Sequence, residues 1–205
     1  MDVNRIVLVE GVSDRTAVLA LAARYGRDLA ADGVAVIAMG GATNIGHFVD
    51  RYGPPGLGLP LAGLCDAGEE RGFCRALDRA GLGDGLDRDG LERLGFFVCV
   101  ADLEDELIRS VGATALEVVA AQGDIGSFRT FAKQPAHRDE TRDQQLHRFL
   151  GTRSGRKNLY ARALTEALDL NRVPAPLRAL LAHVLRRPYV DSSMAGCAAL
   201  ASLSP

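Results

Sequence analysis

The sequence lacks a long uncharged run of apolar residues, although 47% of its 205 residues are hydrophobic. No stretch is therefore predicted to span a membrane, and a membrane is not an expected partner. The first ten residues, MDVNRIVLVE, do not follow the basic, apolar and small-residue order of a secretory signal. The four cysteines show no metal-ligand spacing. We therefore expect a protein of the reducing cytoplasm.

Lysine is scarce as well, because Lys133 and Lys157 are the only lysines among 24 basic residues.

The net charge of -2 hides a division along the chain, since residues 1–125 carry a net charge of -9 and residues 126–187 carry +8. A basic segment suits a polyanion, because neutralised phosphates release counterions. A solvated helical surface explains the same charges equally well.

Apolar runs alternate with helical patterns over the first 112 residues. We predict strands at 5–10, 34–39, 61–65 and 95–100, and helices near 14–25, 43–52, 69–80 and 103–111. This order is typical of a parallel sheet with helices on both faces. The stretches at 40–41, 53–60 and 81–90 are rich in glycine or proline, and we expect turns and loops there.

Beyond residue 112 the strand signals fade. Helices are expected near 113–121, 124–133, 139–150, 157–168 and 176–186. We therefore predict an α/β core over residues 1–112 and a basic helical extension over 113–187 that completes the same domain. A small-residue tail is expected over 188–205.

Acidic residues follow three of the predicted strands. Glu10 ends the first strand, Asp66 follows the third, and Glu104 comes just after the fourth. Because ligands bind outside the carboxyl ends of parallel strands, we expect these side chains to converge. Clustered carboxylates raise one another's pKa unless a cation lies among them. Oxygen ligands without cysteine or histidine suit one or two Mg²⁺ or Mn²⁺ ions.

Local structure explains some of the polar residues. Asp14 can cap the helix that follows Glu10, and the helix dipole favours a carboxylate there. No such role explains Glu10 itself. His47, His137 and His147 are interpreted as surface or helix residues and not as ligands.

A set of short motifs carries a family resemblance. The chain reads LVEGVSD at 8–14, GG at 40–41, an acid after the third strand and LEDEL at 103–107. This pattern resembles the TOPRIM domain shared by topoisomerases, primases and some nucleases. The Glu10 and Asp14 pair, and Lys157 in GRKNLYARAL, are similar to the TOPRIM domain of the OLD-family nucleases over roughly residues 4–165. The implied fold is Rossmann-like, with a central parallel sheet of about four strands and a helical C-terminal extension.

The resemblance implies a metal-dependent endonuclease that cuts DNA, with Glu10 and Lys157 as catalytic residues. The implied metal ligands are Glu10, Asp14, Asp66, Glu69, Glu104 and Glu106. The residues expected to bind nucleic acid are Arg148, Arg153, Arg156 and Lys157. Lys157 also stands out by composition, because 22 of the 24 basic residues are arginine. The compact ammonium of a lysine can donate to a phosphate without the planar geometry that a guanidinium requires.

The family's usual companion is an ATPase domain of the ABC type. The motif GxxxxGK[ST] does not occur in these 205 residues. We therefore expect a stand-alone TOPRIM protein, with an ATPase acting in trans as a candidate partner.

One position departs from the family pattern. Where the family has Asp-x-Asp after the third strand, this chain reads CDAGEE and places Gly68 at the second aspartate. Either Glu69 or Glu70 reaches the metal, with Glu69 favoured, or one metal site is lost. The two glutamates can also simply complement the dipole of the helix that they begin.

Loss of a metal site leads to the alternative function, a catalytically degenerate module that binds nucleic acid or a protein partner. A phosphoacceptor receiver is a third and weaker interpretation. It needs two adjacent acids after the first strand, where VEG offers only Glu10.

Overall fold

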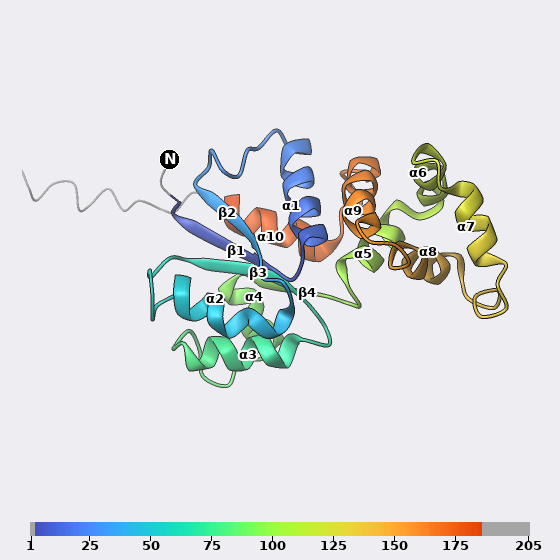
Figure 1. The fold of residues 1–205 in the computed structure, drawn as a ribbon. Helices are drawn as coiled ribbons and strands as arrows, with labels where there is room; N and C mark the ends of the chain where they lie inside the picture. The colour runs from blue at the N-terminus through green and yellow to red at the C-terminus, as the bar shows by residue number, and fades with distance from the viewer. Residues whose placement is uncertain (1–2, 186–205) are drawn as a thin grey trace, which may run out of the picture.

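The computed structural model describes residues 3–185 and contains one four-stranded sheet. All neighbouring strands are parallel, in the order β2-β1-β3-β4 (Figure 1). The strands are β1 (Arg5–Val9), β2 (Val34–Ala38), β3 (Leu61–Asp66) and β4 (Phe96–Cys99). The central strand β1 pairs Val7 with Val36 on one side and with Ala62 on the other. The predicted parallel sheet of about four strands is confirmed.

One face of the sheet is covered by α1 (Val12–Arg24) and α10 (Ala175–Leu185). Val7 and Leu64 of the sheet share one apolar core with Leu21 of α1 and Leu180 of α10. Arg5 joins the two ends of this layer, because its Nη1 donates to the backbone carbonyl of Val184 at 2.7 Å. The last described helix is therefore part of the sheet's own packing.

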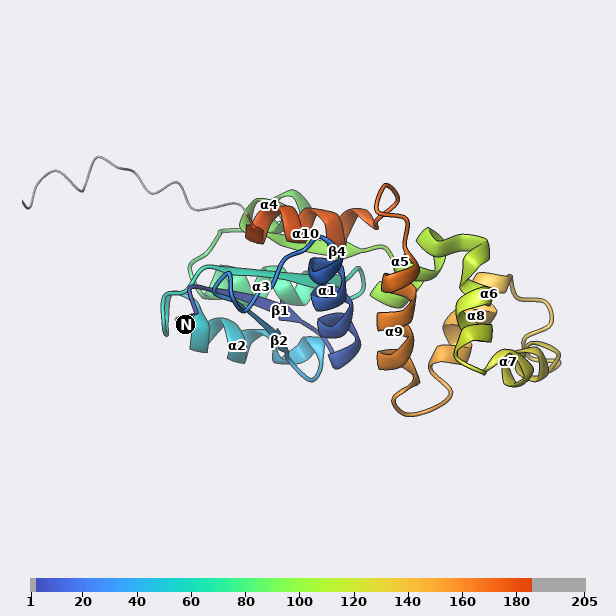
Figure 2. The same ribbon diagram turned by 90° about the horizontal axis from the view of Figure 1, so that it is seen from above.

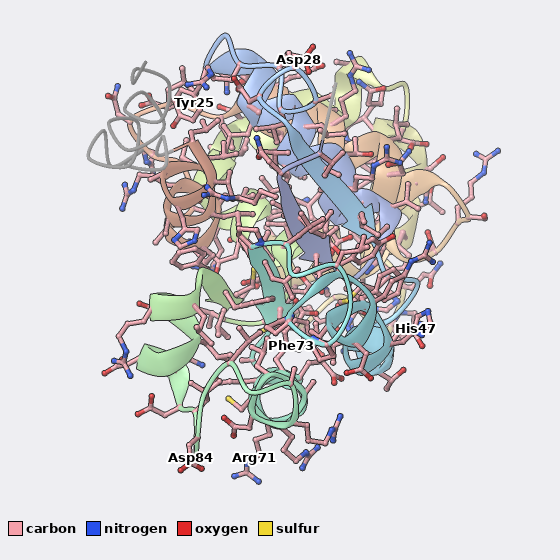
Figure 3. The ribbon with its side chains drawn as sticks, turned by 90° about the vertical axis from the view of Figure 1, so that its left-hand side faces the viewer. Tyr25, Asp28, His47, Arg71, Phe73 and Asp84 are labelled. Carbon is pink, nitrogen blue, oxygen red and sulfur yellow. The ribbon has the colours of Figure 1, made fainter. Side chains whose placement is uncertain are left out.

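The opposite face is covered by α2 (Ile45–Tyr52), α3 (Glu70–Arg79) and α4 (Arg88–Leu94), with a short 3₁₀ turn at Ala42–Asn44 before α2. Phe73 points from α3 toward the sheet (Figure 3), where it is fully buried. Its ring lies edge-to-face with that of Phe96 on β4, with the centroids 6.0 Å apart. Aromatic pairs of this geometry stabilise a core beyond the area that they bury.

Helix α4 corrects the prediction of a loop over 81–90, because it begins at Arg88. Asp87 caps it, with Oδ1 accepting a hydrogen bond from the amide of Gly90 at 2.8 Å. Leu91 is fully buried, and Gly95 ends the helix in the left-handed conformation with φ of 91°. Seven residues are too few to show a helical period, so the capping and the burial of one leucine decide the structure.

The C-terminal part of the described chain is helical, as predicted. It contains α5 (Leu103–Val111), a 3₁₀ turn at Gly112–Thr114, α6 (Ala115–Ala121), α7 (Ile125–Ala132), α8 (Arg142–Leu150) and α9 (Arg156–Ala167). Helices α6, α7 and α8 lie beyond α9 on the side away from the sheet (Figures 1 and 2). No helix in residues 3–185 is long and apolar enough to cross a membrane.

Helix α9 connects this part to the sheet. It packs along α1, and Thr16 of α1 donates a hydrogen bond to Asn158 of α9 at 2.5 Å. The apolar core that begins at Val7 continues through Tyr160 of α9 to Phe149 of α8. The division at residue 112 stays a prediction, and the predicted tail over 188–205 lies outside the described residues.

Candidate metal and nucleic-acid site

The carboxyl ends of β1 and β3 lie at the topological switch point of the sheet, where the connections to the next strand run in opposite directions. The chain leaves β1 for β2 on one side and leaves β3 for β4 on the other, which makes this edge the usual place for a ligand. Glu10 follows β1 directly, and Asp66 is the last residue of β3. The carbonyl of Glu10 accepts hydrogen bonds from the amides of Gly40 and Gly41 at 3.0 and 3.2 Å. The GG motif therefore fixes the backbone at Glu10.

Helices contribute further acids to this edge. Asp14 lies in the first turn of α1, where its Oδ2 accepts a hydrogen bond from the amide of Gly11 at 2.7 Å. Glu69 precedes α3, and its amide donates to the carbonyl of Asp66 at 2.9 Å. Glu104 lies in the first turn of α5. We call Glu10, Asp14, Asp66, Glu69 and Glu104 the acidic edge.

Burial, together with neighbouring carboxylates, raises the pKa of Glu10, Asp14 and Asp66 in the acidic edge. Burial, with Glu104 and Glu10 adding to it, raises the pKa of Asp14 to about 7. Burial and then the charge of Glu10 raise the pKa of Asp66 to about 7. The pKa of Glu10 is also raised, first by burial and then by Glu69. This is the behaviour expected of clustered carboxylates without a cation among them.

Glu104 has an additional feature. Its side chain is buried, and within residues 3–185 its Oε1 has no hydrogen-bond partner. The nearest cation is Lys157 in the first turn of α9, with Nζ 3.6 Å from that oxygen. A buried carboxylate oxygen without a hydrogen bond is costly and calls for a ligand or an ion.

The acidic edge fits a hard divalent cation by its chemistry, because all its candidate ligands are carboxylate oxygens. In the part of the chain that the structure describes, no three acidic, histidine or cysteine side chains are grouped closely enough to hold a metal ion as they stand. Gly68 leaves room for a further ligand, since a Cβ added there would meet no atom within 4 Å.

Comparison with known proteins gives the family. Residues 3–67 match the family model for the TOPRIM domain of proteins like the overcoming lysogenization defect (OLD) protein. A structure of the C-terminal region of the OLD protein of Xanthomonas campestris pv. campestris, phased with iodine, is 30% identical, with a TM-score of 0.66. The match covers 88% of this chain and 93% of that one. This chain belongs to the OLD-like TOPRIM family.

Further solved structures agree with this fold. The same region of the Xanthomonas protein, phased with mercury, is 27% identical over 88% of this chain and 94% of that one, with a TM-score of 0.67. The C-terminal region of the Burkholderia pseudomallei OLD protein is 21% identical over 90% and 98% of the two chains, with a TM-score of 0.69, and shows the fold alone. No curated protein matches in sequence. The predicted family and fold class are confirmed.

Glu106, a predicted ligand, has both carboxylate oxygens engaged elsewhere in this OLD-like TOPRIM chain. Its Oε1 accepts a hydrogen bond from the amide of Val100 at 2.9 Å, and its Oε2 pairs with Nη2 of Arg109 at 2.9 Å. Glu106 is buried. It holds the turn between β4 and α5, so we do not include it in the acidic edge.

Arg156 corrects one prediction of nucleic-acid binding. Its side chain is only 9% exposed, and its guanidinium lies 4.0 Å from the centre of the Phe149 ring. Its Nη1 donates to Thr152 Oγ1 at 2.7 Å, and its Nη2 donates to Asp124 at 3.3 Å. The guanidinium holds α9 against α8 and is not available to a phosphate.

The other predicted nucleic-acid contacts of this OLD-like TOPRIM chain are exposed. Arg148 on α8 is 61% exposed and pairs with Glu140. Arg153 is exposed in the turn between α8 and α9, and Lys157 is exposed in the first turn of α9. Their role on DNA stays a prediction.

Sequence reasoning missed a contact between Asp102 and His147. Asp102 caps α5 through Oδ1, which accepts a hydrogen bond from the amide of Asp105 at 2.8 Å, and its Oδ2 lies 2.6 Å from Nε2 of His147. Burial alone would raise the pKa of Asp102, but the bonds from His147 and Asp105 hold it below its ordinary value. The spacing of Asp102 and Asp105 could have indicated the cap. Nothing local links residues 102 and 147.

Proposed function

We propose that this OLD-like TOPRIM chain is an endodeoxyribonuclease that hydrolyses DNA phosphodiester bonds with Mg²⁺ or Mn²⁺. One observation carries the proposal: acids that follow separate strands lie along one edge, where Glu104 has a buried oxygen without a hydrogen bond within residues 3–185 and Lys157 lies 3.6 Å from it. Burying like charges together destabilises a fold unless a ligand uses them. The family match over residues 3–67 includes Glu10, Asp14 and Asp66 and supports the proposal.

The acidic edge would hold one or two ions. A divalent ion there supplies an activated water and stabilises the leaving oxygen of the phosphodiester. Glu10 would be one ligand, and the hydrogen bonds from Gly40 and Gly41 to its carbonyl fix its backbone.

Lys157 would act on the phosphate itself. Its side chain is 48% exposed, so one side of the ammonium faces Glu104 and the rest is open to a ligand. A compact ammonium can neutralise charge that develops on the phosphate. Arg148 and Arg153 would hold the DNA backbone, and such contacts position the strand without reading its sequence.

The direct test is the cutting of supercoiled plasmid in Mn²⁺. Glu10→Gln and Asp66→Asn keep the size of each side chain and remove its charge. Each should lower the cutting rate by ~10²-fold or more, because metal assistance contributes several kcal/mol to this chemistry. Glu92→Gln is the matched control, since Glu92 is an exposed glutamate of α4. Cutting that survives in both edge variants would overturn the proposal.

A second candidate function rests on Gly68, which stands where the family has an aspartate. The chain would then be a degenerate module that binds DNA with a steep salt dependence but without metal chemistry. Calorimetry with Mg²⁺ and Mn²⁺ separates the two candidates, because the module should bind neither ion at millimolar concentration.

Gly68→Asp sharpens this distinction. Among the described residues, no atom lies within 4 Å of a Cβ added at Gly68, so the backbone there accepts a side chain. If the wild type is the degenerate module, Gly68→Asp should gain Mn²⁺ binding, while the uncharged control Gly68→Asn should not. If the wild type already binds and cuts, the same change should alter metal affinity only a few-fold.

A further inference from the structure

A hollow of about 420 Å³ lies beside the acidic edge. Residues of α8 and α9 supply its basic lining, namely His147, Arg148 and Lys157. Lys157 therefore belongs to both places, since its Nζ also lies 3.6 Å from Glu104. A ligand held in the hollow would adjoin anything bound at the acidic edge.

His147 is held in one orientation in this hollow. Its Nε2 lies 2.6 Å from Oδ2 of Asp102, and the other oxygen of Asp102 is fixed by the amide of Asp105. Among the described residues, no group bonds the second ring nitrogen, Nδ1. The imidazole is thus anchored on one side and keeps a polar atom for a ligand on the other.

Arg148 and Lys157 each pair with a glutamate, but their side chains stay 61% and 48% exposed, so both remain open to an anion. Asp105 lines the hollow but pairs with Arg109, with Nε and Oδ2 2.8 Å apart. The hydrogen bond to Asp102 is the largest influence on His147 and raises its pKa, although burial and then Lys157 oppose this shift. A protonated imidazole donates from both nitrogens, so a ring bonded to Asp102 through Nε2 can still donate from Nδ1.

We infer that His147, positioned by Asp102, binds the DNA phosphate next to the one attacked at the acidic edge. The hollow has room for a phosphate with its sugar, and hydrogen bonds from cationic donors to phosphate oxygens are short and strong. His147 is a binding residue in this assignment, and Asp102 is a positioning residue that acts through it. The inference rests on the proposed function because it takes DNA as the ligand.

The test measures DNA binding without metal. Fluorescence anisotropy follows a labelled duplex of about two helical turns, in EDTA and over a range of NaCl concentrations. His147→Gln should weaken binding by roughly 5- to 10-fold and reduce the salt slope by about one unit. Asp102→Asn should cause a smaller loss, and the double variant should bind no more weakly than His147→Gln, because Asp102 acts only through the imidazole.

His47→Gln is the matched control, because His47 is an exposed histidine of α2, on the other face of the sheet (Figure 3). A second measurement needs no variant. In the wild-type protein labelled with ¹⁵N-histidine, the duplex should shift the imidazole resonances of His147 and leave those of His47 unchanged. The inference is overturned if His147→Gln binds like the wild type with the same salt slope, or if the duplex leaves the His147 imidazole unchanged.

Measuring DNA binding in EDTA and plasmid cutting in Mn²⁺ tests this inference and the proposed function separately. If His147→Gln loses DNA affinity but the wild type never cuts in Mn²⁺, the phosphate site stands and the nuclease proposal fails. If the wild type cuts and His147→Gln keeps its affinity and salt slope, the nuclease stands and the phosphate site fails.

Discussion

The acidic edge and the helices beyond it use charge in opposite ways. At the edge, Asp14 and Asp66 lie among other acids that raise their pKa to about 7. On the helices, which carry a net positive charge, several charges have a partner of opposite sign, as in the pair of Arg162 and Glu166 at 2.7 Å. Matched surface pairs contribute little to stability and imply no ligand. Unmatched carboxylates at a strand edge destabilise the fold, so the acidic edge is the better indicator of function.

The largest effect should come from Lys157, which adjoins both the acidic edge and the basic helices. Lys157→Met should lower the plasmid-cutting rate by ~10²–10³-fold, because it removes the cation that would neutralise the phosphate. The metal affinity from calorimetry should not fall, since Glu104 loses only a competing partner. Lys133→Met is the control, as the other lysine is exposed at the end of α7. Full cutting by Lys157→Met would remove Lys157 from the mechanism.

The next effect should come from reversing Arg148 and Arg153 to glutamate. DNA affinity should fall, and the slope of log affinity against log salt should flatten by up to about two units, with metal affinity nearly unchanged. The control reverses Arg71 and Arg75, which are exposed on α3 at the other face of the sheet. If only the control changed DNA binding, the basic helices would be a solvated surface.

Arg156 supplies the contrast within the same helices, because its guanidinium is buried against Phe149 and paired with Asp124. Arg156→Met should lower the free energy of unfolding by roughly 2 kcal/mol, since the half-buried Asp124 loses its cation and keeps only the hydrogen bond from Tyr160. Urea denaturation measures this change. The salt slope of DNA binding should stay that of the wild type if the variant is folded.

The smallest effect concerns pH. The folded-state pKa of Asp66 is about 7 against an ordinary 3.8, so its protonated form favours folding. This contribution is complete below about pH 4 and is lost as the pH rises through 7. In EDTA, the melting temperature of the wild type should therefore fall more than that of Asp66→Asn between pH 5.5 and 8, by about 5 °C. Thermal unfolding of both proteins measures the difference. Parallel plots of melting temperature against pH would show that the pKa of Asp66 is not raised in the folded state.

Much of this architecture follows from local signals. Each strand is an apolar run close to its predicted range, and helices α5 to α9 form within a few residues of their expected positions. The exception is α4, whose seven residues, capped by Asp87, are too few to show a period. Because parallel strands bring their carboxyl ends to one edge, the positions of Glu10 and Asp66 along the chain were enough to place them together.

The sequence by itself thus determined the sheet and the family and placed Glu10 and Asp66 at one edge, because apolar runs, strand ends and short motifs are local properties of the chain. Only the tertiary structure decided which polar side chains are free to act. The carboxylate of Glu106 accepts a hydrogen bond from the amide of Val100, and the guanidinium of Arg156 is buried against the ring of Phe149. The tertiary structure also brought His147 to Asp102, 45 residues apart. Such pairings depend on how α8 and α9 pack against α5, and packing between distant helices leaves no periodic signal in the sequence.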